Sequence, residues 1–297
     1  MSKARVSALR AALRDAGFEG WIQPRADEFQ GEYVPPSGAR LAWLTGFTGS
    51  AGLAVVLQAR AAVFSDGRYT LQLRDQIDLE IFEPRHSTDT PATEWIAAAL
   101  PAGGKLAYDP WLLTDGDIAK FAKAAAAAGG ELVAADRNLL DAAWTDRPAP
   151  PQAPIAPQPL EYAGEASALK RQRLGEGLAK DKLEAAILTQ PDGIAWLLNV
   201  RGGDVEHTPL PLSFATLSAD GGADWFVDPA KLTDATRAWV GNGVRLRAIS
   251  EFAPSLDGHA GQRVAVAPSA PAAVRRRLEA AGAEVVVCSV EEEGRLE

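Results

Sequence analysis

One phrase occurs twice in the sequence. Residues 41–50 are LAWLTGFTGS and residues 194–203 are IAWLLNVRGG, so each copy places an apolar stretch around Ala-Trp-Leu before a polar, glycine-containing turn. In both copies Leu and Ala recur at helical spacing before a short apolar run, and two more apolar runs follow the phrase. The shared order is helix, strand, helical phrase, turn, strand and strand. The chain is therefore predicted to contain two copies of one α/β unit.

The predicted fold class is α/β, with two tandem homologous domains that are each a three-layer α/β/α sandwich. Helices alternate with strands in each copy, which favours a mixed sheet flanked by helices. Residues 147–159, RPAPPQAPIAPQP, hold six prolines and favour an extended connector. We place the domains at 1–150 and 151–297, and expect Trp43 and Trp196 to occupy equivalent elements. The Ala-rich stretch 119–130 should be a helix that ends at paired glycines.

Composition excludes several classes of protein. The 297 residues carry a net charge of -9, which argues against a nucleic-acid partner because phosphate binding needs clustered Lys and Arg. The basic cluster 275–277 is predicted to be a solvated helix face. The single cysteine, Cys288, is expected to be an inert, buried strand residue, and it leaves no disulfide framework or cysteine-based zinc site.

Membrane and secretory segments are not predicted. No apolar run approaches the ~20 residues that cross a bilayer, and the charged N-terminus lacks a signal-peptide core. We therefore expect a cytoplasmic protein with no membrane partner.

Few residues suggest chemistry. His86 and His259 stand in polar contexts and are predicted to be surface histidines. Asp204, Glu206 and His207, in RGGDVEHTPLP, form the one tight group of acids and a histidine. Such a loop can bind a metal weakly, but a capped turn or a domain contact also explains it. The sequence contains no HExxH helix and no GxSxG elbow, and TGFTGSAG lacks the Lys-Ser/Thr of a phosphate loop, so neither catalytic nor metal-binding residues are predicted.

The stretch DGRY at residues 66–69 follows a predicted strand and opens a predicted, partly buried helix. Asp66 is expected to cap that helix, and Gly67 to supply an unusual backbone angle. This structural interpretation stands beside a functional one. In the second, Arg68 or Tyr69 helps to line a substrate site that another domain builds.

The phrases LAWLTGFTGSAG, FSDGRYTLQ, WTDRPAPP and IAWLLNVRGGDVEHTPLPLSFA resemble the N-terminal half of cytosolic-type, three-domain Xaa-Pro aminopeptidases (aminopeptidase P). The resemblance runs in order from Arg5 to about Val290. It implies two creatinase-like N-terminal domains, which accounts for the repeated phrase. A related creatinase or prolidase is a further hypothesis, although each normally has only one such domain.

The resemblance also implies what this sequence does not contain. Family members hold two divalent metal ions, manganese or zinc, on two Asp, one His and two Glu of a third, pita-bread domain, whose phrases are absent here. The sequence therefore suggests a truncated or N-terminal-only form, with no cofactor of its own and with Leu296 and Glu297 as a possible expression-vector scar. The expected partners are the missing catalytic domain and, in the complete enzyme, proline-containing peptides. A homodimer is possible.

Two classes of function stay open. In the first, the chain is the non-catalytic N-terminal region of a peptidase that removes an N-terminal residue before proline, and it shapes substrate access and assembly. In the second, it is a stand-alone binding or assembly module derived from that family. The candidates for substrate access or domain docking are Arg68, Tyr69, Arg201, Asp204, Glu206 and His207. If the loop that carries the last four docks on another domain, it should be exposed, with Arg201 and His207 lacking strong partners.

Overall fold

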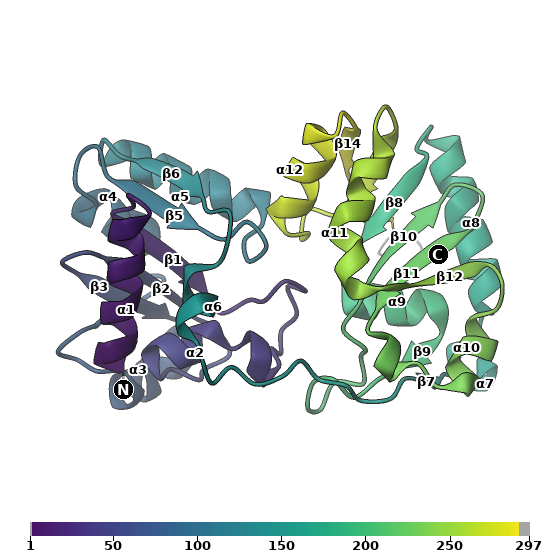
Figure 1. The fold of residues 1–297 in the computed structure, drawn as a ribbon, viewed down its shortest axis with the longest axis horizontal. Helices are drawn as coiled ribbons and strands as arrows, with labels where there is room; N and C mark the ends of the chain where they lie inside the picture. Colours follow the sequence, from purple (N-terminus) through teal and green to yellow (C-terminus); the bar gives the residue numbers. More distant parts are fainter. Residues whose placement is uncertain (1, 291–297) are drawn as a thin grey trace. The chain divides into compact units, whose positions relative to one another are not determined.

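A computed structural model describes residues 2–290 (Figure 1). By contact, the chain divides into two compact units. Unit 1 holds the chain up to Glu28 and Pro36–Pro150, and unit 2 holds Phe29–Pro35 and the chain from Pro151 onward. A short segment of the first half of the sequence therefore belongs to unit 2. Leu296 and Glu297, with their suggested vector origin, lie outside the described residues.

Unit 1 is built on a six-stranded mixed sheet. Its strands are β1 (Gly20–Pro24), β2 (Leu53–Leu57), β3 (Ala61–Ser65), β4 (Glu83–His86), β5 (Lys105–Tyr108) and β6 (Glu131–Ala134). They lie in the order β4-β3-β2-β1-β5-β6. The β1–β2 and β2–β3 pairs are antiparallel, and the other neighbours are parallel.

Helices cover both faces of this sheet. They are α1 (Ser2–Asp15), η1 (Pro36–Gly38), α2 (Arg40–Thr45), η2 (Gly67–Tyr69), α3 (Thr70–Gln76), α4 (Ala92–Ala99), α5 (Asp115–Ala127) and α6 (Leu139–Ala143). Because neighbouring strand residues point to opposite faces, Trp21 packs in the core under α1, α2 and α6, whereas Ile22 packs under α4 and α5. Unit 1 is therefore the predicted three-layer sandwich.

Unit 2 repeats the design. Its strands are β7 (Ala156–Pro157), β8 (Ala185–Leu188), β9 (Val200–Arg201), β10 (Phe214–Ser218), β11 (Ala223–Val227), β12 (Val244–Ala248), β13 (Arg263–Val266) and β14 (Glu284–Val287). The main sheet has six strands in the order β12-β11-β10-β8-β13-β14, and β7 pairs with β9 apart from it.

The helices of unit 2 also form two layers (Figure 1). They are α7 (Leu160–Ala163), α8 (Ser167–Lys180), α9 (Pro191–Leu198), η3 (Pro229–Lys231), α10 (Asp234–Val240), η4 (Ile249–Glu251), α11 (Phe252–Ser255), η5 (Leu256–His259) and α12 (Ala272–Ala280). Trp225 packs in the core with α8 and α9. On the opposite face, Phe252 of α11 stacks on Phe214 with ring centroids 4.1 Å apart.

The two sheets correspond strand for strand. β1 and β8 each pair antiparallel with the following long strand and parallel with the fifth strand of their own sheet. The first long helix of each unit, α1 or α8, is the first helix of the shared frame. The two end alike, because the Phe18 amide donates to the Leu13 carbonyl and the Leu183 amide donates to the Leu178 carbonyl, both at 2.8 Å. Trp43 lies on α2 and Trp196 on α9, each between the first two strands of its sheet. The predicted duplication is confirmed.

The two tryptophans occupy equivalent positions and each makes the same kind of contact with a cation. The Arg5 guanidinium lies 4.8 Å from the ring centroid of Trp43 and donates a hydrogen bond to the Trp43 carbonyl. The Lys170 ammonium lies 4.5 Å from the ring centroid of Trp196 and donates to the Trp196 carbonyl at 3.0 Å. Each unit thus ties its first helix to the repeated phrase through one cation, which combines a cation–π contact with a charge-assisted hydrogen bond.

Two local expectations need correction. Gly67 does not adopt a left-handed conformation, because the 3-10 turn that starts there needs only ordinary backbone angles. Cys288 lies just beyond β14 and is half-buried, because the strand ends at Val287. In the proline-rich connector, which was predicted to be extended, Ala156 pairs with Arg201 as a short strand.

Two other local predictions are confirmed. Helix α5 ends at Ala127, and Gly129 beyond it is left-handed with φ of 75°. Arg275 and Arg277 pair on the surface with Glu279 and Asp257 at 2.7 and 2.6 Å, as expected for a solvated helix face.

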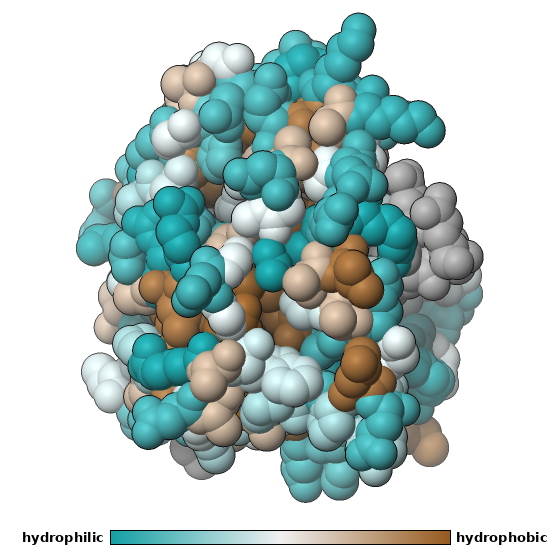
Figure 2. Space-filling model, turned by 90° about the vertical axis from the view of Figure 1, so that its right-hand side faces the viewer, coloured by the Kyte–Doolittle hydropathy of each residue, from teal (hydrophilic) through white to brown (hydrophobic). Residues whose placement is uncertain are grey.

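The side of unit 2 that carries α8 and α10 is an ordinary solvated surface. Figure 2 shows polar side chains over most of this side, with apolar ones in small groups between them. Leu160 and Leu169, for example, are exposed. Scattered apolar residues of this kind are normal on a folded domain.

The shared cation provides a stability test. Lys170 is 2% exposed and also donates to the Asn199 side chain at 2.7 Å. We expect Lys170→Met to lower the free energy of unfolding by about 2–3 kcal/mol, because two buried acceptors lose a charged donor. Urea unfolding followed by tryptophan fluorescence measures the loss.

Lys170→Arg is the matched control, because unit 1 uses Arg at the equivalent position. This variant should lose less than half as much stability as Lys170→Met. Equal losses in the two variants would show that a positive charge over Trp196 is not sufficient to stabilise unit 2.

Candidate functional site

The loop of residues 201–212 begins in the short strand β9, just after helix α9. Helix α9 ends at Asn199, which adopts a left-handed conformation with φ of 50°, and β9 then pairs with β7. Gly202 packs directly on the returning chain, since a Cβ there would lie 2.8 Å from the Pro211 nitrogen. The base of the loop is therefore closely packed and needs glycine at this position.

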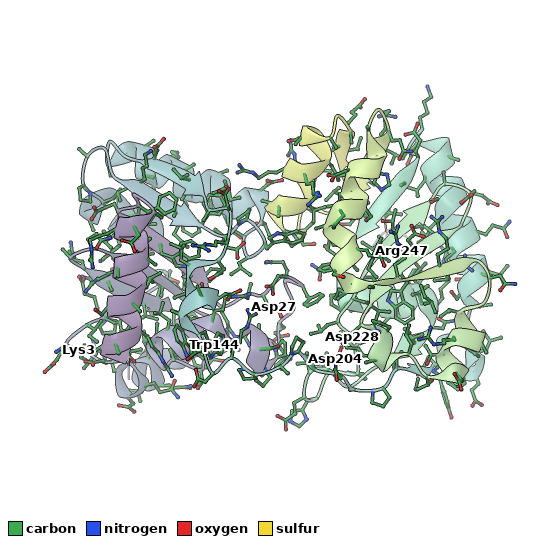
Figure 3. The ribbon with its side chains drawn as sticks, in the orientation of Figure 1. Lys3, Asp27, Trp144, Asp204, Asp228 and Arg247 are labelled. Carbon is green, nitrogen blue, oxygen red and sulfur yellow. The ribbon has the colours of Figure 1, made fainter. Side chains whose placement is uncertain are left out.

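Asp204 is buried below the tip of the loop. Its Oδ2 accepts hydrogen bonds from the Lys231 ammonium at 2.6 Å and from the Leu212 amide at 2.7 Å. Asp204 and Lys231 are 5% and 4% exposed. Figure 3 labels Asp204 near Asp228, which caps the 3-10 turn η3 by accepting from the Ala230 amide at 2.9 Å. This turn places Lys231 beside the loop.

The expectation that the whole loop is exposed is therefore wrong for Asp204. A buried carboxylate is tolerated here because a buried ammonium compensates its charge. The sequence did not reveal Lys231, since 27 residues separate the pair and no motif links them. Asp204 belongs to the internal structure of unit 2.

Glu206 and His207 form the exposed tip. Their side chains are 88% and 84% exposed, and the His207 Nε2 lies 3.5 Å from a Glu206 carboxylate oxygen. The tip is a tight turn in which the Thr208 amide donates to the Val205 carbonyl at 3.3 Å. His207 has φ of 61°, a left-handed conformation that favours glycine over histidine.

Arg201 lies between the buried and the exposed parts of the loop. It is half-buried, and its Nη1 donates to the carbonyl of the preceding Val200 at 2.8 Å. Within residues 2–290, no carboxylate forms an ion pair with Arg201. Arg201, Glu206 and His207 thus remain available for contacts outside the loop, unlike Asp204.

The candidates of unit 1 are satisfied locally. Asp66 accepts from the Arg68 amide at 3.0 Å and pairs with the Arg68 guanidinium at 2.7 Å, so the predicted cap is present. The Arg68 guanidinium holds the pKa of the Asp66 carboxyl below its usual range. The Tyr69 hydroxyl lies 2.6 Å from the Ser50 hydroxyl, and this hydrogen bond lowers the pKa of the Tyr69 phenol.

No metal centre is formed within residues 2–290, where no three His, Cys, Asp or Glu side chains gather in a way that could hold an ion. The two other histidines bond locally. The His86 Nδ1 accepts from the Thr88 amide at 3.3 Å, and the His259 Nδ1 lies 2.7 Å from the Gln262 side-chain oxygen.

The buried pair gives a test of the loop's base. We expect Asp204→Ala to lower the free energy of unfolding by about 3–5 kcal/mol, because it leaves the Lys231 ammonium buried without its counterion. Urea unfolding measures the loss. Glu206→Ala at the exposed tip should change stability by less than about 0.5 kcal/mol.

A double variant, Asp204→Leu with Lys231→Met, removes both charges and should recover most of the stability that Asp204→Ala loses. If Asp204→Ala unfolds at the same urea concentration as the parent chain, the buried pair does not support the loop.

Both halves of the chain match family models. Residues 5–142 match one model described as the creatinase/prolidase N-terminal domain, and residues 146–291 match a second model of that description. Of the described residues, none forms a helix that is both long enough and apolar enough to cross a membrane.

Curated relatives cover both halves at once. A probable Xaa-Pro aminopeptidase P of Coccidioides posadasii (strain RMSCC 757 / Silveira) is 34% identical over 255 residues, which cover 85% of this chain and 42% of that protein. A probable Xaa-Pro aminopeptidase P of Coprinopsis cinerea is 32% identical over 251 residues, which cover 84% of this chain and 40% of that protein. The chain thus spans about two-fifths of the length of these relatives.

A solved structure agrees with these matches. The X-prolyl aminopeptidase of Caenorhabditis elegans, described as a cytosolic enzyme with a di-nuclear active site, has a TM-score of 0.89 and 25% identity to this chain. The match covers 98% of this chain and 50% of that one. Two tandem domain matches, which together span residues 5–291, establish that the chain belongs to the creatinase/prolidase N-terminal domain family, and it is similar to part of curated Xaa-Pro aminopeptidases P.

Proposed function

We propose that the chain is a non-catalytic region that shapes how peptides reach the catalytic domain of an Xaa-Pro aminopeptidase on the same polypeptide. The family assignment and the relatives' greater length support this proposal. Within it, unit 2 contributes the exposed tip of the 201–212 loop, and the substrates are peptides with proline in the second position. The cytoplasm is the proposed location.

The observation that carries the proposal is the contrast within one loop. Asp204 is buried and paired with Lys231, which gives the loop a rigid base. Glu206 and His207 stand on that base with their side chains in solvent. A left-handed backbone at His207 costs stability relative to glycine, and such strain concentrates at functional positions. An imidazole and a carboxylate held in this way suit a partner surface or a peptide with complementary polar groups.

The residues of this chain do not fit a catalytic metal pair, because no suitable group of ligands lies within residues 2–290. We therefore derive no catalytic step from them. In the proposal, two divalent ions, manganese or zinc, and the hydrolytic chemistry belong to the polypeptide that follows this region in longer relatives. Arg68 and Tyr69 of unit 1 stay as proposed contributors to substrate access.

The activity test uses a chimera in which residues 1–290 precede the C-terminal part of the Coccidioides posadasii relative. We expect the chimera, loaded with manganese, to release Arg from an Arg-Pro-Pro peptide, and the 297-residue chain alone to release none. Turnover by the chain alone would contradict the proposal. If the C-terminal part alone is as active as the chimera, this region does not shape access, and a stand-alone binding role fits better.

The tip can be tested in the same chimera. We expect His207→Gly to lower kcat/KM by about ten-fold, a loss of about 1.4 kcal/mol of transition-state stabilisation. The unfolding temperature should not fall, because glycine adopts the left-handed conformation without strain. The matched control is Lys182→Gly, since Lys182 is exposed and has φ of 60°. An equal kcat/KM in the His207→Gly and Lys182→Gly variants would show that the loop tip does not contribute to substrate access.

A further inference from the structure

The sixth strands of the two sheets end in the same way. After β6, the Ala135 amide donates to the Tyr108 carbonyl at 2.9 Å, and after β14 the Cys288 amide donates to the Val266 carbonyl at 3.0 Å. Ala135 and Cys288 are therefore equivalent positions. The residues that follow them can be compared one by one.

In unit 1, the chain beyond this point covers the first helix. Leu139 and Leu140 of α6 are buried in one core with Leu9 and Leu13 of α1. Trp144, which is labelled in Figure 3, follows α6. Its ring stacks on that of Trp43, with ring centroids 5.4 Å apart. Asp141 holds α6 to α2 through Arg40, at 2.7 Å. An apolar helical turn thus closes this side of the sandwich.

In unit 2, the equivalent surface lines a groove of about 420 Å³. Leu174 and Leu178 of α8 are the counterparts of Leu9 and Leu13, because both first helices end with the same hydrogen bond one turn later. The other apolar lining residues come from the end of the helix and from the last strand: Leu183, Val286, Cys288 and Val290.

The sequence of residues 291–297, EEEGRLE, does not repeat the apolar pattern of α6. Counted from Cys288, the positions of Leu139 and Leu140 fall on Glu292 and Glu293. These residues lie outside the described part of the chain. Burying carboxylates against leucine and valine side chains costs free energy, whereas burying leucine and tryptophan side chains there is favourable.

We propose that this groove is the docking site for a short apolar helix of the α6 kind, supplied by the catalytic part of the same polypeptide in its full-length form. This inference rests on the proposed function, which provides the longer polypeptide. The internal repeat defines the chemistry of the occupant, namely two adjacent leucine-like residues and an aromatic one turn later. The charged residues Arg173, Lys180, Asp181 and Arg263 also line the groove.

The first test asks whether the groove accepts such a helix. Residues 291–297 are replaced by NLLDAAW, the sequence of residues 138–144. Because Cys288 is the single cysteine and lines the groove, its reaction with a thiol reagent reports occupancy. We expect the graft to slow this reaction by about ten-fold and to raise the unfolding temperature. A control graft with Ala at the two Leu and the Trp should do neither, and equal behaviour of the two grafts would overturn the proposal.

The second test identifies the occupant. In the chimera, Cys288 labelling measured by mass spectrometry should be about ten-fold slower than in the 297-residue chain. Equal labelling in an active chimera would overturn the groove proposal and leave the proposed function intact. Slow labelling in an inactive chimera would support the groove and count against the function.

Two further outcomes of this test would also overturn the proposal. If removal of residues 291–297 speeds labelling of the chain alone by about ten-fold, the acidic tail is the occupant. If labelling of the chain alone slows as its concentration rises, the occupant of the groove is a second copy of the chain.

Discussion

In each unit, a cation on the first helix lies over the tryptophan of the repeated phrase and donates to its carbonyl. Arg5 makes this contact with Trp43, and Lys170 makes it with Trp196. The contact fixes the helix before the first strand against the helix after it, so both pack on one face of the sheet. The antiparallel turn into the second strand and the parallel return of the fifth then follow the same path in both units. The features that differ between the two units, such as the 201–212 loop, are additions to this shared arrangement of helices and strands.

The sequence was sufficient to predict the frame because its signals are local and repeated. Apolar periodicity, the Ala-Trp-Leu phrase and the proline-rich connector indicated two α/β sandwiches, and the resemblance indicated the family. The pairs that complete each unit join distant residues, so the sequence did not reveal them. Lys231 compensates Asp204 across 27 residues, and Arg40 binds Asp141 across 101. A charged residue gives no sign in the sequence of where its partner lies, and for this reason Asp204 was expected at the surface.

The two units share one arrangement of strands and helices but differ in the segments at its edges. Unit 1 closes its first-helix side with α6 and Trp144, whereas the equivalent side of unit 2 forms a groove lined in part by Leu174, Leu178 and Val290. Unit 2 in turn carries the 201–212 loop, with a buried ion pair below two exposed polar residues. An open apolar groove and a strained polar tip add nothing to the stability of an isolated sandwich. Both fit the proposal that unit 2 contacts a catalytic domain.

The central claim is that unit 2, through its groove and its loop, meets the catalytic domain. Hydrogen–deuterium exchange of the 297-residue chain and of the chimera tests it most directly, because amide protection reports burial segment by segment. The account predicts slower exchange in the chimera for the loop tip at residues 205–208 and for the end of β14, with unchanged exchange in α1 and α6. Protection confined to unit 1, or no difference at the loop and at β14, would contradict it.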